Sequence, residues 1–526
     1  MNKVLASLLL SLIVAPANAQ VSEEAPVLVV GITVDQLRSD YLYALQQLFG
    51  EKGFKRLMRE GVVCDEVLYE LPYIDRAVST ATIYTGTLPF NNGIPSETIF
   101  DPISRKTKEI LHDPKYMGNA TDDTYSAVAL QVSTLSDEVK IVGNGLGRVF
   151  SVAPDAASAI LSAGHIANSA FWIDDETGRW VTTTYYNDAP AYILQRNYTQ
   201  SLSSRIDTMK WSPIYAPERY TAIPYRMQPL SFKYAFSRAD RNCYARYKTS
   251  ALVNNEVTDV AVELVEKGLL GQRGYLDMLN IGYTLAPYNG GTIQQYATEL
   301  QDSYVRLDRE LGRLFDAIDR VVGLRNAVVF VTSTGYFSGE GREPNIFKIQ
   351  SGEFYPKRAV SLLNMYLMAL YGNGDWVAGF SHNQIYLNRS LIKEKDLDIE
   401  TVRDKCAAFL IDMEGVQDVY TLQRILLRST NEHTDALRRG LSPQHSGDLF
   451  IELVPGWEIV YEDELNTREY VRHNAVQTPF MLMAPSVPAQ KIDTPIDAIA
   501  IAPTVARVLR IRSPNGCTAR PLHITE

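Results

Sequence analysis

Val27-Leu-Val-Val-Gly-Ile-Thr-Val34 is a continuous run of apolar and β-branched residues, and Asp35 follows it directly. A strand of this kind is apolar on both faces, which is typical of a parallel sheet covered by helices on both sides. Helical patterns separate several similar runs, and this alternation predicts an α/β fold. The other runs are Val149–Ala153, Tyr275–Tyr283, Ala327–Thr332, Asp448–Val454 and Phe480–Ala484.

Two helices are predicted most clearly. Between Thr292 and Val322 apolar residues recur at steps of three and four, which indicates a long amphipathic helix packed on the sheet. A last helix is expected from about Pro495 to Arg510, because Pro is favoured in the first turn and Ser513-Pro514-Asn515-Gly516 is a stop signal.

Three regions are richer in Tyr, Pro, Asn and charged residues than the predicted sheet. They lie near residues 91–125, 181–247 and 339–440, and we expect them to be insertions or cap elements within one domain that spans residues 20–526. Ligands of open α/β sheets bind beyond the carboxyl ends of the strands. Asp35, the segment after Thr332 and the segment before Phe480 should therefore face one shared crevice.

Composition restricts the classes of partner. The chain has 526 residues, of which 46% are hydrophobic and 21% charged, so it can bury a large core. The formal net charge is −10, which gives no electrostatic reason for nucleic acid or an anionic membrane to be a partner.

The amino-terminal residues resemble a cleaved secretory signal. Lys3 precedes an apolar run from Val4 to Val14, and Ala17-Asn18-Ala19 precedes Gln20. The run is about half the roughly 20 residues that a bilayer needs, and no later stretch reaches that length. We therefore expect residues 1–19 to be a signal peptide and the mature chain, from about Gln20, to be periplasmic or secreted, without a transmembrane segment.

The four cysteines are far apart and show no zinc-ribbon spacing. An oxidising compartment permits up to two disulfides with three possible connectivities, whereas buried free thiols are about as common an outcome for any one residue. Both outcomes stay open for Cys64, Cys243, Cys406 and Cys517.

Six short blocks, in order along nearly the whole mature chain, resemble the alkaline phosphatase superfamily, and nearest the periplasmic phosphate-irrepressible alkaline phosphatases. The resemblance implies a three-layer α/β sandwich with a central, mostly parallel sheet and inserted cap elements. It also implies a metal-dependent phosphatase or phosphodiesterase with a Thr or Ser nucleophile between two zinc ions held by three Asp and three His. The blocks are Val34–Tyr41, Gly53–Leu57, Ile83–Gly86, Ala163–Asn168, Phe171–Asp175 and Ile501–Thr504.

Carried over position by position, the resemblance implies a degenerate site. Only Asp35 matches a metal ligand, and the nucleophile position falls on Arg76, whose guanidinium stays protonated and cannot attack phosphorus. The other five ligand positions fall on residues that zinc rarely or never uses as ligands. A small shift of register restores a metal ligand only at the last of these positions, where a shift of four residues offers His473. These five are Thr284, Tyr288, Thr334, Gly335 and Gln477.

The positions that bind substrate phosphate in the superfamily are also replaced in this sequence. Its phosphate-binding Asn falls on Glu97, and its Lys and Arg fall on Asp155 and Ala157. Carboxylates at two such positions should repel a phosphate dianion. We expect Arg76 to replace part of the missing cationic charge by pairing with Asp35, Asp155 or Glu97, because a recessed carboxylate is costly without a partner.

The sequence thus predicts a secreted pseudophosphatase without cofactor, which acts as a binding or scaffolding module for an extracytoplasmic protein, glycan or small ligand. The alternative is a phosphate- or sulfate-ester hydrolase with a non-standard site, for which zinc would be expected. A third possibility is a subunit of an envelope complex. Fold does not decide among these functions.

Overall fold

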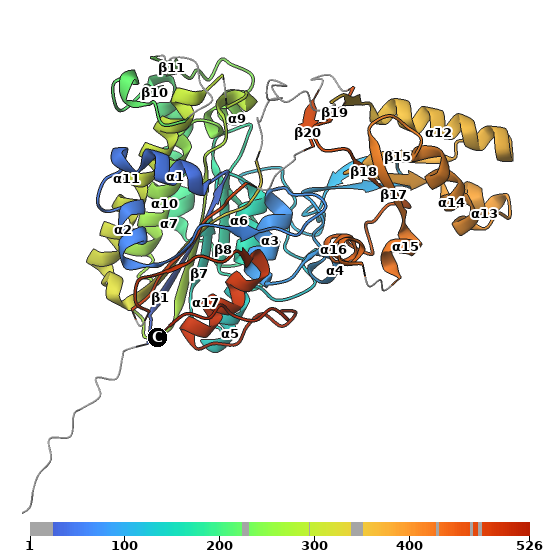
Figure 1. Ribbon diagram of the computed structural model, residues 1–526. Coiled ribbons are helices and arrows are strands. Elements are labelled where there is room, and N and C mark those ends of the chain that lie inside the picture. The colour runs from blue at the N-terminus through green and yellow to red at the C-terminus, as the bar shows by residue number, and fades with distance from the viewer. Residues whose placement is uncertain are drawn as a thin grey trace, which may run out of the picture.

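The computed structural model describes residues 25–223, 231–293, 295–337, 351–427, 431–462, 467–471, 476–485 and 487–525. The chain forms a body around a large twisted sheet, and a second lobe projects from one side of that body (Figure 1). Residues 1–24 lie outside the described residues, so the signal peptide stays a prediction. No helix in the described part of the chain is both long and apolar enough to cross a bilayer.

The central sheet is mixed but mostly parallel, as predicted. Its strand order is β22-β2-β21-β13-β1-β12-β7-β8-β9-β6, and the five strands from β13 to β8 run parallel. The parallel strands are β13 (Ala327–Ser333), β1 (Leu28–Asp35), β12 (Asp277–Thr284), β7 (Val149–Val152) and β8 (Ser169–Ile173). The outer strands are β22 (Gln490–Ile492), β2 (Val62–Cys64), β21 (Phe480–Met483), β9 (Trp180–Thr183) and β6 (Gly118–Asn119).

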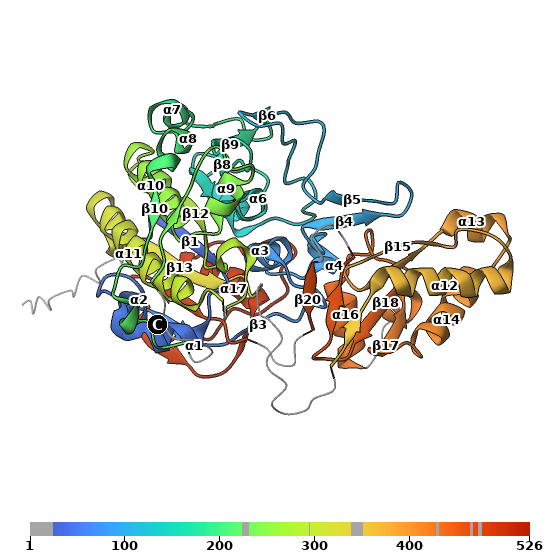
Figure 2. The ribbon, with the colours of Figure 1, turned by 90° about the horizontal axis from the view of Figure 1, so that it is seen from above.

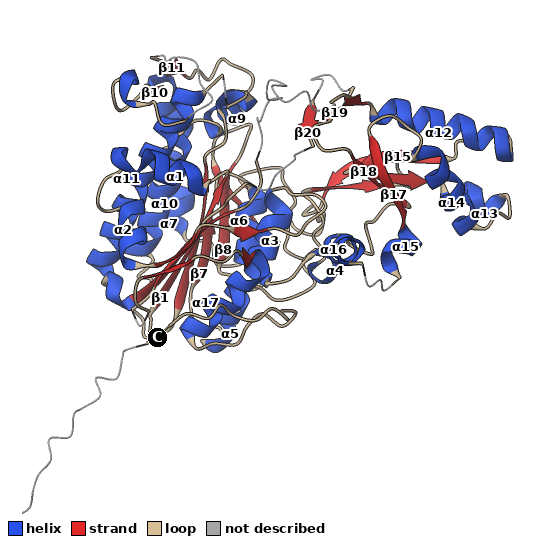
Figure 3. Cartoon of the chain, viewed as in Figure 1, coloured by secondary structure: helices blue, strands red, loops and turns tan. Residues whose placement is uncertain are grey.

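Helices cover both faces of this sheet and complete the three layers (Figure 3). Side chains of β1 point alternately to the two faces: Val30, Ile32 and Val34 join the core on one side, and Val29 joins the core on the other. The first side is covered by α1 (Ser39–Leu45), α2 (Phe54–Glu60), α7 (Ala191–Thr199), α10 (Leu252–Lys267) and α11 (Ala297–Val321). The second is covered by α3 (Arg76–Thr85), α5 (Leu135–Val142), α6 (Ala156–Ala163) and α17 (Ile501–Leu509).

The projecting lobe has its own four-stranded antiparallel sheet and its own apolar core. The predicted strand at Asp448–Val454 belongs to this sheet rather than to the central one. Its strands are β15 (Val377–Ser381), β16 (Gln384–Leu387), β18 (Leu449–Leu453) and β17 (Val416–Thr421). Its helices are α12 (Pro356–Tyr371), α13 (Arg389–Glu394), α14 (Ile399–Leu410), α15 (Leu422–Leu426) and α16 (Glu432–Gly440), and short strands β14 (Glu353–Phe354), β19 (Glu458–Val460) and β20 (Arg468–Tyr470) join it to the body.

The three regions predicted as insertions lie mostly beside the central sheet, but β6 and most of β9 fall within them and are strands of that sheet. Residues 91–125 contain a hairpin that points toward the projecting lobe (Figure 2), residues 181–247 pack over the helices at one end of the body, and the described part of 339–440 lies in the lobe. Residues 339–350 lie outside the described residues. The hairpin is β4 (Thr98–Asp101) and β5 (Lys106–Glu109), preceded by α4 (Pro89–Asn92); the second region includes α8 (Leu202–Arg205), β10 (Lys210–Trp211), β11 (Tyr234–Ala235) and α9 (Cys243–Lys248).

The remaining elements are short. Strands β3 (Val67–Leu68) and β23 (Ile496–Asp497) pair, and the 3-10 helices are Gln46–Leu48, Ile206–Thr208, Pro217–Arg219, Tyr288–Gly290, Leu324–Asn326 and Ala498–Ala500. Because residues 496–500 form β23 and a 3-10 turn, the last α-helix begins later than predicted. All four cysteines are unpaired, and all but Cys517 are buried.

Candidate functional site

Asp35 ends β1 at the carboxyl edge of the central sheet and is only 3% exposed. One carboxylate oxygen accepts a hydrogen bond from the hydroxyl of Thr334 (3.0 Å), which directly follows the neighbouring strand β13. The antiparallel strand β21 starts at the same edge, where Phe480 pairs with Thr332. The prediction that these segments face one crevice is confirmed, and it follows from the parallel order of β1 and β13.

Arg76 occupies the centre of this crevice. Its Nε lies 2.6 Å from Oδ2 of Asp35 and 3.2 Å from Oδ2 of Asp155, and its Nη1 lies 3.9 Å from Oε2 of Glu97. The side chains of Arg76 and Asp35 are 24% and 4% exposed, so this cluster is recessed. The prediction that Arg76 pairs with Asp35, Asp155 or Glu97 is confirmed.

Two helix caps fix the positions of these groups. Asp75 caps α3 by accepting from the Val78 N–H (2.9 Å), and its other oxygen accepts from the Glu97 N–H (2.6 Å). Asp155 caps α6 in the same way. Sequence reasoning gave Asp75 no role, although an Asp directly before a helical segment is a recognisable capping signal.

The crevice carries more negative than positive charge. Burial lowers the pKa of Arg76, but Asp155, Asp35 and Glu97 together raise it well above its usual value, so the guanidinium stays charged. Burial also raises the pKa of Asp35, and Arg76 opposes that rise. One cation therefore faces three acidic side chains.

Glu97 is the member of the cluster that titrates near neutrality. Burial raises its pKa to about 7; Arg76 opposes the rise, and the charges of Asp155, Asp75 and Asp35 add to it. Its side chain is still 43% exposed, so solvent screens part of the repulsion. Around neutral pH this side chain changes the charge of the crevice by one unit.

Three other predicted site positions, Thr284, Tyr288 and Ala157, make contacts that hold the fold together. Thr284 pairs with Asp35 across β12 and β1, and its backbone N–H donates to an Asn side chain. Tyr288 packs in an aromatic cluster, and Ala157 is buried in α6. Ligand binding at any of these positions stays a prediction.

Two further predicted positions lie at the edge of the sheet. Gly335 has a left-handed backbone (φ 66°) and lies against the ring of Tyr69, whose hydroxyl donates to the carbonyl of Ser333. Gln477 is exposed, and its carbonyl accepts from the Ser39 N–H (3.0 Å). His473, the alternative to Gln477, lies outside the described residues.

A recess of about 690 Å³ opens beside the cluster and shares Glu97 and Asp155 with it. Its charged lining consists of eight carboxylates and two cations, Arg179 and Lys248, and rings of Tyr125 and Trp172 form part of the wall. We call it the acidic recess. Its other carboxylates are Glu109, Asp122, Asp123, Asp174, Asp175 and Glu176.

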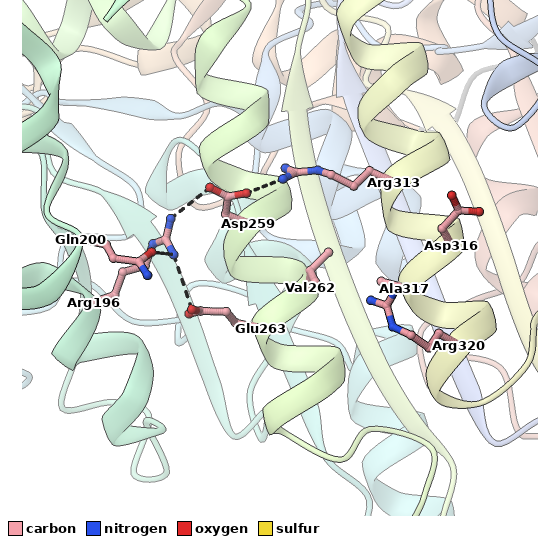
Figure 4. Close-up of a pocket in the computed structure, with 9 residues that line it drawn as sticks. All are labelled: Arg196, Gln200, Asp259, Val262, Glu263, Arg313, Asp316, Ala317 and Arg320. Atoms are coloured by element: carbon pink, nitrogen blue, oxygen red, sulfur yellow. Dashed lines mark hydrogen bonds and ion pairs between the residues drawn. The ribbon is translucent and has the colours of Figure 1, made fainter. Parts of the chain in front are cut away.

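A second hollow, of about 450 Å³, lies on the outer helical layer between α7, α10 and α11 (Figure 4). Its three arginines already have acidic partners: Arg196 pairs with Asp259 and Glu263, Arg313 with Asp259, and Arg320 with Glu266 outside the hollow. Its lining is close to neutral and its charges hold the helices together. We therefore do not consider this hollow a candidate functional site.

Comparison with protein families matches residues 29–477 to the family described as type I phosphodiesterase / nucleotide pyrophosphatase. The chain belongs to this family. That membership, within the alkaline phosphatase superfamily, agrees with the resemblance in the sequence.

Three relatives illustrate the similarity. The alkaline phosphatase PhoV of Synechococcus elongatus is 28% identical, covering 93% of this chain and 91% of its own. A protein of Myroides odoratus named calcium-transporting ATPase is 28% identical, and the match covers 95% of this chain and 94% of that protein. The alkaline phosphatase PafA of Elizabethkingia meningoseptica is 25% identical over 94% of each chain. A crystal structure of PafA superposes with a TM-score of 0.82, over 95% of this chain and 98% of that one, at 24% identity, which confirms the fold.

Family membership contradicts the prediction that the protein has no cofactor, because the alkaline phosphatases of this family are metal-dependent. The prediction rested on comparing single ligand positions with the family pattern, and family membership outweighs such a comparison. The described residues of the crevice nevertheless do not fit a metal pair. Both oxygens of Asp35 are bonded to Arg76 and Thr334, and no group of three His, Cys, Asp or Glu among the described residues could hold an ion.

Proposed function

We propose that this protein is a binding member of its family that takes a positively charged group into the acidic recess and does not hydrolyse phosphate esters. The observation that carries the proposal is the position of Arg76. Its guanidinium lies between Asp35 and Asp155, at the position that the family resemblance assigns to the nucleophile. A guanidinium remains protonated in proteins and cannot act as a nucleophile.

The surroundings of Arg76 offer no replacement for that nucleophile. The hydroxyl of Thr80 donates to the backbone carbonyl of Arg76, and the hydroxyl of Thr334 donates to Asp35. The hydroxyl of Ser79 is fully buried within α3. None of the described hydroxyls near Arg76 has a His beside it to act as a base, as nucleophilic catalysis by Ser or Thr requires.

The charge of the acidic recess favours a positively charged ligand. Eight carboxylates against two cations give the wall a strongly negative potential, which attracts cations and repels phosphate. Lys248 is already paired with Asp175 (2.7 Å), so part of the positive charge is neutralised within the wall. The rings of Tyr125 and Trp172 suit cation–π contact with an ammonium or guanidinium group. A polyamine or a basic side chain of an extracytoplasmic protein fits this wall.

Binding calorimetry with spermidine as probe tests the proposal. We expect binding that weakens at least tenfold in Asp175→Asn and on protonation of Glu97 below pH 6, and no binding of inorganic phosphate. Asp412→Asn, at an exposed carboxylate of the projecting lobe, is the matched control and should bind like the unmodified protein. Equal affinity of both variants, or preference for phosphate, would contradict the proposal.

The second candidate function is a metal-dependent phosphate- or sulfate-ester hydrolase, and family membership favours it over loss of activity. In that function a bound metal would supply the activation of an oxygen nucleophile. The arrangement of Arg76 with its carboxylates favours the binding function. Turnover of a phosphate ester by the unmodified protein would select the hydrolase. In either function the amino-terminal pattern from Lys3 to Ala19 supports a place of action outside the cytoplasm.

A further inference from the structure

The β15–β16 hairpin of the projecting lobe reaches the body at β4 (Figure 2). His382 and Asn383 form its two-residue loop, between the paired residues Ser381 and Gln384. Both loop residues have left-handed backbones, with φ of 48° and 58°. A tight hairpin turn requires this conformation at both positions, but it is uncommon outside glycine, and a residue that adopts it is held there by its surroundings. The contacts of His382 therefore stabilise this turn.

The imidazole of His382 contacts both the body and its own hairpin. Its ring packs edge-on against the ring of Tyr73, with the centroids 4.3 Å apart. Its Nε2 lies 3.5 Å from the hydroxyl of Thr98, and its Nδ1 lies 2.9 Å from the hydroxyl of Ser381. Thr98 begins β4 and directly follows Glu97 of the crevice. We call the contact of His382 with Tyr73 and Thr98 the joint, because it links the lobe to the segment that carries Glu97.

Body and lobe meet tightly around the joint. The space left between them is about 10 Å³, which is room for one water molecule at most. Its walls are apolar or neutral polar side chains of both parts, such as Ile99 of β4 and Tyr386 of β16, and a second histidine, His445, lies among them. None of the described residues that line this space is a carboxylate. A positive charge inside the joint would have no acidic partner, which is costly.

The histidines and tyrosines around the joint are uncharged at pH 7. Burial lowers the pKa of His382 to about 4. Burial also lowers the pKa of His445, and the charge of Lys108 on β5 adds to that shift. Burial raises the pKa of Tyr73 and of Tyr386, so both phenols keep their protons. Carboxylates act on these tyrosines, but in the described part of the chain none raises the pKa of either histidine. They are Asp75 and Glu469 at Tyr73, and Asp448 at Tyr386.

We propose that the joint is an acid-sensitive latch, in which a proton taken up by His382 loosens the lobe from the body. The docked ring resists protonation because no acidic group compensates the charge, whereas a ring released into water takes up a proton near its ordinary pKa of 6.5. The joint is therefore fully stable above pH 6.5 and loses stability as the pH falls toward 4. These two pKa values make the joint about thirtyfold weaker at pH 5 than at pH 7.5.

The latch acts on the crevice through the segment before β4. The N–H of Glu97 donates to Asp75 (2.6 Å), the residue that caps α3 directly before Arg76. Thr98, the next residue along the chain, contacts His382. Release of the lobe in acid thus removes support from the segment that carries Glu97, whichever function the crevice serves.

Hydrogen–deuterium exchange of the full mature chain at pH 7.5 and pH 5, measured by mass spectrometry, tests the latch. After correction for the intrinsic exchange rate at each pH, we expect the protection of residues 96–101 and 377–387 to fall at least tenfold at pH 5. His382→Asn should remove this pH dependence, because Asn adopts a left-handed backbone readily and carries no charge. His523→Asn, at an exposed histidine near the carboxyl end of the chain, is the matched control and should keep it. Glu97 titrates in the same window in all three proteins, so the comparison isolates His382.

Equal protection of the unmodified chain at both pH values would overturn the proposal. A fall of the same size in His382→Asn would also overturn it, because the proton would then bind elsewhere. So would a loss of protection that extends to α14 in the core of the lobe, because the lobe would then unfold as a whole rather than separate from the body.

Discussion

Replacement of Arg76 by Ala should destabilise the fold strongly and in a pH-dependent way. Among the described residues, the substitution removes the only cation that forms ion pairs with Asp35 and Asp155, and the carboxylate of Asp35 is 4% exposed. Removing one partner of a buried pair typically costs about 3 to 5 kcal/mol, because it leaves an uncompensated buried charge. Thr334 still donates to Asp35, which places the expected loss at the lower end, about 3 kcal/mol at pH 8.

The pH dependence of this loss follows from the carboxylates that remain. Without Arg76, the pKa of Asp35 rises further in the folded protein, because the charged carboxylate has lost the cation that lowered its pKa. Protonation at low pH then removes the unpaired charge and restores part of the stability. The loss caused by Arg76→Ala should therefore be smaller at pH 5 than at pH 8.

Urea unfolding monitored by tryptophan fluorescence measures both effects. Arg105→Ala is the matched control, because Arg105 pairs with Asp375 on the surface, and exposed pairs contribute about 0 to 1 kcal/mol. A loss for Arg76→Ala no larger than that of the control, or a loss that grows toward pH 5, would refute the reasoning about the buried cluster.

Three other substitutions test separate parts of the account. The pKa of Glu97 is about 7 in the folded protein and 4.5 in the unfolded chain. The protonated side chain therefore stabilises the fold below pH 4.5, and this stability is lost as the pH rises through 7. Glu97→Gln should flatten the slope of melting temperature against pH between pH 4.5 and 7. Asp448→Asn removes the buried carboxylate that two arginines of the projecting lobe share, and should lower the free energy of unfolding by about 3 to 5 kcal/mol in urea titrations; a loss below about 1 kcal/mol would contradict it. Gly335→Ala should lower the melting temperature more than Gly290→Ala: both have positive φ, but only at Gly335 would a Cβ meet the ring of Tyr69, at 2.4 Å; equal shifts would contradict the steric argument.

The sequence predicts the central sheet and the crevice because both depend on local patterns. The apolar run ending at Asp35 identifies a buried parallel strand, and the carboxyl ends of such strands meet at one edge. Family positions then place Arg76 in the crevice, and the cost of a recessed carboxylate predicts its pairing with Asp35, Asp155 or Glu97. The same counting of positions gave the wrong answer for the cofactor, because it judged each donor by itself and the family as a whole is metal-dependent.

Features that depend on distant segments could not be predicted in this way. The acidic recess joins Glu97, Asp123 and Asp174, which lie on separate loops. The run at Asp448–Val454 has the composition of a central strand, and only tertiary packing assigns it to the projecting lobe.

Hydrolysis of a chromogenic phosphomonoester and of a phosphodiester by the purified mature protein, with zinc added to excess, tests the central claim most directly. In the described part of the crevice, Arg76 holds the nucleophile position between its carboxylates, so the account predicts no turnover above that of buffer with zinc. Turnover that follows the protein through purification and disappears in Asp35→Asn would contradict the account and establish the hydrolase.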